Sequence, residues 1–129
     1  MTPSVVVDTN VFVAAGFRPA SASGRLIEAV RRGAVCLLWS EATRRETESL
    51  LRKIPPLSWE SVADLFLEPN RRSSTAEADA FSMVADPEDR KFAALAASCG
   101  ATLISLDHHL LGAQLSESCT VRTPSEFLD

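Results

Sequence analysis

Hydrophobic residues in this 129-residue chain fall into two kinds of pattern, short continuous runs and longer stretches of helical spacing. Short aliphatic, β-branched runs predict buried strands, which we place at 4–7, 34–39, 102–106 and 119–122, with a weaker one at 81–85. Apolar residues three or four positions apart predict helices, which we place at 10–15, from Ser21 or Ser23 to Gly33, from Ser40 to about Lys53, and at 58–68, 87–99 and 108–111, with a final turn at 124–128. The polar stretch 69–80 predicts a loop. This alternation indicates an α/β fold, a parallel sheet with helices on both faces, in a single domain spanning residues 1–129.

Four acidic residues occur where an apolar run ends or a helix begins or continues. They are Asp8 after the first strand, Glu46 in the helix after the second, Asp89 at the start of a helix, and Asp107 after the run 103–106. The carboxyl ends of parallel strands share one edge, so we expect these residues to converge there. Clustered carboxylates repel and need protons or cations, and oxygen ligands suit Mg²⁺ or Mn²⁺. The pattern predicts a metal-dependent phosphodiesterase.

Three of these acids also have a purely structural explanation. Asp8 or Asn10 could cap the short helix that follows. Asp86 suits a helix cap before Pro87, and Asp89 would then complement the helix dipole. Asp107 could cap its own short helix in the same way, so helix starts alone are a weak sign of a metal site.

Glu46 is harder to explain structurally, because it lies six residues past the predicted cap Ser40. Ala42, Glu46 and Leu50 are spaced by four, which places the carboxylate on one helix face with apolar neighbours. An unpaired carboxylate facing a core is costly. Glu46 therefore needs a metal, a position at the edge of that face, or a base such as Arg44 as its partner.

Composition narrows the function classes. The net charge of −4 does not suggest a protein that coats nucleic acid, although a bound metal would reverse the local charge at an acidic site. No apolar stretch reaches the roughly 18 residues of a membrane span, and no secretory signal is recognisable. We expect a cytoplasmic protein without a membrane association, whose three cysteines are reduced and buried.

Several segments, taken in order, resemble the motifs of PIN domains. The similar segments are Val5–Val11, Ser40–Glu46, Asp86–Ala96, Ser105–Asp107 with Leu110 and Leu111, and Val121–Leu128, the last of which resembles the end of a bacterial subfamily of toxin components. Ser105 stands where threonine is commoner, which keeps the hydroxyl. His108 and His109 are not part of the pattern, and an exposed first helical turn explains them as well as a role near the metal does.

The resemblance implies a three-layer α/β/α sandwich around a parallel sheet and a Mg²⁺- or Mn²⁺-dependent endoribonuclease. It also implies a cognate antitoxin protein and a homodimer. By position, the acidic quartet that binds metal and performs catalysis would be Asp8, Glu46, Asp89 and Asp107, supported by Asn10 and Ser105. Arg44 and Lys91 lie close in sequence to quartet acids and are candidate contacts to RNA phosphates.

Two other functions remain open from the sequence. The first is a non-catalytic PIN-like module that binds RNA or a protein. The second is a phosphatase with an aspartyl nucleophile, which usually has a second acid two residues on, where this chain has Asn10. The dispersed glycines and the lack of a Gly-x-x-x-x-Gly-Lys run argue against a phosphate-loop nucleotide site.

Overall fold

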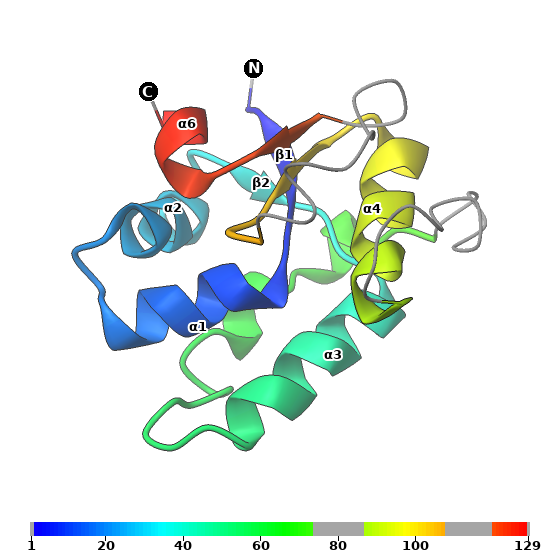
Figure 1. Ribbon diagram of the computed structural model, residues 1–129. Helices are drawn as coiled ribbons and strands as arrows, with labels where there is room; N and C mark the ends of the chain where they lie inside the picture. Colours follow the sequence, from blue (N-terminus) through cyan, green and yellow to red (C-terminus); the bar gives the residue numbers. More distant parts are fainter. Residues whose placement is uncertain (1, 74–86, 108–119, 129) are drawn as a thin grey trace.

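The computed structural model describes residues 2–73, 87–107 and 120–128, with the side chains of residues 87–89 left out. The elements in chain order are β1 (Ser4–Val7), α1 (Thr9–Phe17), α2 (Ala22–Arg31), β2 (Cys36–Leu37), α3 (Glu41–Arg52), the 3₁₀ turns η1 (Ala63–Leu65) and η2 (Glu68–Asn70), α4 (Pro87–Cys99), β3 (Thr102–Ile104), β4 (Val121–Arg122) and α6 (Pro124–Leu128) (Figure 1). The predicted strand 81–85 and helix 108–111 lie outside the described residues. Among those described, no helix combines the length and apolar character that a membrane crossing requires.

The described strands form one parallel sheet in the order β2-β1-β3-β4. β1 lies in the interior, with Val5 opposite both Leu37 of β2 and Thr102 of β3. Because β1 and β3 are parallel neighbours, the carboxyl end of β1 lies beside that of β3. The predicted parallel sheet is confirmed.

Side chains alternate between the two faces of the sheet and build a core on each side. Val5, Val7 and Ile104 pack into one cluster with residues of α1, α2 and α6, whereas Val6 and Leu103 pack against α4. Figure 1 shows α1 and α2 on one side of the strands and α4 on the other, with α3 beyond the end of β1. This arrangement is the three-layer α/β/α sandwich that the sequence predicted.

Local sequence signals fix several helix ends. Ser21, rather than Ser23, caps α2 by accepting a hydrogen bond from the amide of Gly24 at 3.2 Å. Ser40 and Thr43 form a reciprocal capping box at the start of α3. Gly33, with φ of 82°, follows α2 in a left-handed conformation that favours glycine.

The helix predicted at 58–68 is wrong. Within it the structure forms the short turn η1, and η2 begins at its last residue, Glu68. The ring of Phe66 contacts Trp59, Phe12 and Trp39, with centroids 5.1, 5.7 and 5.9 Å away. Tertiary burial of this aromatic cluster overrides the helical spacing.

Candidate active site

Asp8 follows β1 directly and is almost completely buried, with 3% of its surface exposed. It occupies the N-cap position of α1, but its side chain makes no capping hydrogen bond. Its Oδ2 instead accepts a hydrogen bond from the Ser105 hydroxyl at 2.9 Å, across 97 residues of sequence. Asp8 thus stands at the cap position without a geometric side-chain cap, and its carboxylate is turned toward the end of β3.

Burial dominates the electrostatics of this carboxylate. Desolvation raises the pKa of Asp8 to about 6, and the nearby Asp107 carboxylate adds to the rise. The Ser105 hydroxyl and the nearby Thr9 and Asn10 amides act in the opposite direction and lower this pKa, although neither amide meets the geometry of a capping hydrogen bond. Asp8 is thus a costly charge in the metal-free protein, and a cation beside it would lower that cost.

Ser105 and Asn10 connect the ends of β1 and β3. Ser105 is fully buried, and besides donating to Asp8 it accepts hydrogen bonds from the Asp107 amide at 3.0 Å and from Asn10 Nδ2 at 3.5 Å. Asn10 Oδ1 accepts from the Leu106 amide at 3.2 Å. These bonds fix the backbone that carries Asp107. The supporting positions of Asn10 and Ser105 that the sequence suggested are therefore found together.

Glu46 lies at the edge of the buried face of α3. The row that faces inward is Thr43, Thr47 and Leu51, one residue further along than the predicted row containing Ala42, which is exposed. The Glu46 side chain is 32% exposed, and its Oε2 lies 3.6 Å from Lys91 Nζ on α4. Glu46 thus has both a position at the face's edge and a basic partner.

Arg44, which the sequence suggested as another phosphate contact or as the partner of Glu46, points elsewhere on α3. It forms ion pairs with Glu41 and, at 2.8 Å, with Glu48. These pairs raise the pKa of the Arg44 guanidinium, chiefly through its hydrogen bond with Glu41. The structure does not bring Arg44 to Glu46.

A buried hydrogen bond that the sequence did not reveal joins α1 to α3. The hydroxyls of Thr9 and Thr47 lie 3.0 Å apart, and both residues are buried. Each is the residue immediately after a candidate acid, Asp8 or Glu46. The bond therefore fixes the two backbones that carry these acids relative to each other. Nothing in the spacing of two threonines so far apart in the chain signals this contact.

Asp89 belongs to the first turn of α4, and its side chain is outside the described part of the structure. Within the described ranges, no three acidic, histidine or cysteine side chains are close enough together to bind a metal. The donors that are brought together, the Asp8 and Asp107 carboxylates with neighbouring hydroxyl and amide oxygens, are of the hard type that suits Mg²⁺ or Mn²⁺. The chemistry of these donors fits the expected ion. His108 and His109 also fall outside the described residues.

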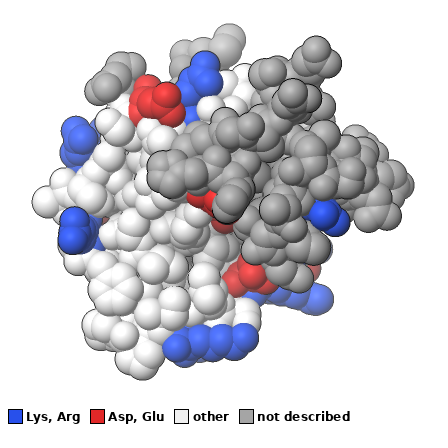
Figure 2. Space-filling view, in the orientation of Figure 1, with Lys and Arg blue, Asp and Glu red and all other residues white. Residues whose placement is uncertain are grey.

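Charged side chains of both signs are visible among the described residues on the surface (Figure 2). Figure 2 shows acidic side chains toward the middle of the face drawn there as well as at its upper edge, while the lysines and arginines of that face lie around its periphery.

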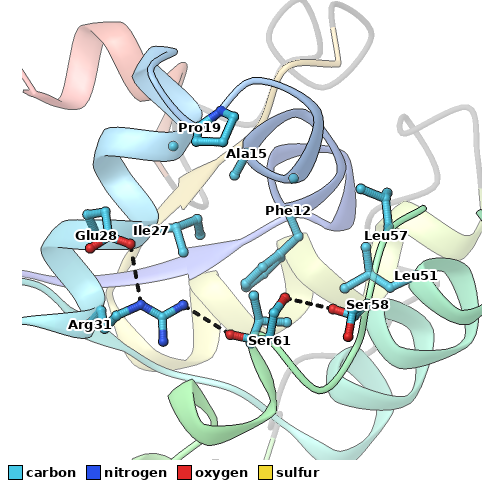
Figure 3. Close-up of a pocket in the computed structure, with 13 residues that line it drawn as sticks. Phe12, Ala15, Pro19, Ile27, Glu28, Arg31, Leu51, Leu57, Ser58 and Ser61 are labelled. Carbon is cyan, nitrogen blue, oxygen red and sulfur yellow. Dashed lines mark hydrogen bonds and ion pairs between the residues drawn. The ribbon is translucent and has the colours of Figure 1, made fainter. Parts of the chain in front are cut away.

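A pocket of different character lies between α1, α2 and the segment 57–62 (Figure 3). Phe12, Ile27 and Leu57 give it apolar walls, and its arginine, Arg31, is engaged by Glu28 at 3.3 Å and by the Ser61 carbonyl at 3.0 Å. Since its polar groups bond within the protein, this pocket offers no group for catalysis comparable to Asp8.

Comparison with known proteins agrees with the fold. A family model described as PIN domain matches residues 4–109. A search of curated proteins finds no match. Among solved structures, a chain of VapBC2 from Rickettsia felis bound to a DNA fragment from their promoter has a TM-score of 0.62 at 14% identity, covering 93% of this chain and 98% of that one.

Two further structures are similar. FitAcB from Neisseria gonorrhoeae has a TM-score of 0.62 at 16% identity, with 94% of this chain and 98% of that chain covered. PAE2754 from Pyrobaculum aerophilum has a TM-score of 0.55 at 18% identity, with 94% and 92% covered. At such identities the likeness shows the fold alone. The family model, however, spans most of the chain and includes Asp8, Glu46, Asp89 and Asp107. With the parallel sheet and the buried aspartate at its edge, it shows that this protein belongs to the PIN-domain family.

Proposed function

We propose that this protein is a Mg²⁺- or Mn²⁺-dependent endoribonuclease that hydrolyses phosphodiester bonds of RNA. The observation that carries the proposal is the buried Asp8 carboxylate, whose pKa is raised to about 6 by desolvation and by Asp107 at the edge of the parallel sheet. A protein keeps such a costly group where its charge is used. Membership of the PIN family, a family of nucleases, supports the same reading.

In this proposal the acidic quartet is Asp8, Glu46, Asp89 and Asp107. Asp8 and Asp89 would hold the ion directly, and Glu46 and Asp107 would hold it directly or through water. When bound, Mg²⁺ or Mn²⁺ supplies positive charge to the phosphate and lowers the pKa of a water molecule. Ser105 orients the Asp8 carboxylate through its bond to Oδ2, and Asn10 holds the backbone before Asp107. The expected products carry a 5′ phosphate, because the 3′ oxygen leaves.

We also propose that the protein acts as the toxin of a toxin–antitoxin pair in the cytoplasm, as a homodimer restrained by a cognate antitoxin. The similar VapBC2 structure contains DNA from the promoter of its own components, which are more than one protein. This similarity supports a partner protein for this chain as well. Co-purification with the product of a neighbouring gene tests this part separately from catalysis.

Cleavage of a labelled structured RNA tests the nuclease. Wild type, Asp8→Asn and Asp64→Asn are purified in parallel and assayed with Mn²⁺, Mg²⁺ or EDTA. Asp64 is the matched control, because it is an aspartate outside the proposed quartet whose side chain is 73% exposed and pairs with Arg31 at 3.6 Å. We expect metal-dependent cutting by wild type and Asp64→Asn and none by Asp8→Asn.

Two results would contradict the proposal. Equal cutting by all three proteins would reveal a contaminating nuclease. Absence of cutting, together with Mn²⁺ binding that does not depend on Asp8, would favour the non-catalytic module instead.

A further inference from the structure

One ion pair joins the candidate site to a positive charge. Lys91 Nζ of α4 lies 3.6 Å from Glu46 Oε2 of α3, and the two side chains are only 27% and 32% exposed. Among the ion pairs formed between described residues, this is the one that includes an acid of the proposed quartet. The pair crosses between two helices, so it depends on how α3 and α4 pack together.

The basic residues of α3 differ from Lys91. Arg44, Arg45 and Arg52 pair with Glu41, Glu48 and Glu60, which are not quartet acids. The one other lysine of the chain, Lys53, is exposed at the C-cap of α3. Lys91 is therefore distinguished by its partner and by its position two residues after Asp89, not by its charge alone.

The geometry of this pair suits exchange of partners. At 3.6 Å and partly exposed, it is a loose contact of a kind that contributes little to stability. A divalent ion that binds Glu46 takes over the neutralisation of its charge and repels the nearby ammonium. A lysine ammonium is a compact charge on a flexible chain and binds phosphate well as a point charge.

We propose that Lys91 is an exchangeable counter-cation of the site. It neutralises Glu46 while no metal is bound, and it turns to a phosphate of the RNA when the ion occupies the carboxylates. This inference rests on the proposed nuclease function and adds a defined role for one residue. It predicts that removing the charge of Lys91 affects metal binding and RNA binding in opposite directions.

The test compares Lys91→Met with Lys53→Met, which lowers the net charge equally, and with Lys91→Arg, which keeps the charge. Mn²⁺ affinity is measured by isothermal titration calorimetry, and binding of a fluorescent single-stranded RNA by anisotropy in Ca²⁺. We expect Lys91→Met to bind Mn²⁺ roughly fivefold more tightly, because one repelling charge is gone. It should bind RNA several-fold more weakly, with the salt dependence of log K reduced by about 0.7 for the loss of one phosphate contact. Lys53→Met and Lys91→Arg should stay close to wild type in both measurements.

Other results distinguish the role of Lys91 from the proposed nuclease function. If Lys91→Met weakens both Mn²⁺ and RNA binding, the residue has a structural role and the exchange is wrong. If Lys91→Met matches Lys53→Met in both, Lys91 has no special role. In either case, loss of Mn²⁺ binding in Asp8→Asn would still support the proposed nuclease function. If Mn²⁺ binding by wild type does not depend on Asp8, both the nuclease function and the role of Lys91 are wrong.

Discussion

Replacing Asp8 with asparagine should stabilise the metal-free protein at neutral pH while abolishing its proposed activity. Burial raises the pKa of Asp8 to about 6, so the folded protein favours the neutral acid. The difference from an ordinary aspartate pKa near 4, at about 1.4 kcal/mol per pH unit, corresponds to roughly 3 kcal/mol for holding the charge above that pH. Asparagine is uncharged, has nearly the same shape, and can still accept the hydrogen bond from Ser105.

The effect should depend on pH in a defined direction. Folded wild type binds the proton on Asp8 more tightly than the unfolded chain does, so this group favours the fold below about pH 4. That contribution is lost as the pH rises from about 4 to about 6, the raised pKa of Asp8. Asp8→Asn has no such loss. The two proteins should therefore be similar near pH 4 and differ by roughly 3 kcal/mol at pH 7.

Urea unfolding in EDTA across this pH range measures the difference, with Asp64→Asn as a control for a mostly exposed aspartate. The corresponding rise in melting temperature at pH 7 is on the order of 10 °C. Added Mn²⁺ should then stabilise wild type but not Asp8→Asn, since only a site in the folded state gains from binding. Equal or lower stability of Asp8→Asn at pH 7 in EDTA would refute the argument from desolvation.

Two further substitutions test other contacts. Ser105→Ala removes the hydroxyl that lowers the pKa of Asp8, so that pKa should rise above about 6 in a carbon-13 NMR titration; an unchanged or lower value would show that the bond contributes nothing. Gly24→Ala should destabilise α2 by at least about 2 kcal/mol, although alanine favours helices, because its Cβ would lie 2.0 Å from the Pro19 carbonyl oxygen. Chemical denaturation checks this, and a gain in stability would mean that the backbone adjusts freely.

The sequence predicted the sheet and its polar edge well, because both depend on short-range patterns. The run before Asp8 and the run before Asp107 are buried strands that lie side by side, which brings the two acids near each other. Strand–acid spacing in a parallel sheet is enough for this inference. The sequence leaves the side-chain direction of Asp8 open, because capping and convergence place the residue at the same point in the chain.

What the sequence could not predict depends on packing between distant elements. The inward face of α3 is shifted by one residue from the expected row, because Thr47 bonds to Thr9 and turns that side of the helix inward. The pairing of Lys91 with Glu46 likewise depends on the contact of α3 with α4. Neither contact can be predicted from the spacing of residues in the sequence.

The hydrogen bond between Ser105 and Asp8 has a consequence for the biosynthesis of the protein. Its two residues are separated by 97 positions, and the Ser105 amide in turn donates to the carbonyl of Arg122 on β4. A chain still being translated has Asp8 and α1 long before it has the strand that completes their surroundings. Contacts of such long range form late, after most of the chain is available. The surroundings of Asp8 are therefore complete only when synthesis is nearly finished, so incomplete chains carry the first aspartate without the strand and the hydroxyl that orient its carboxylate.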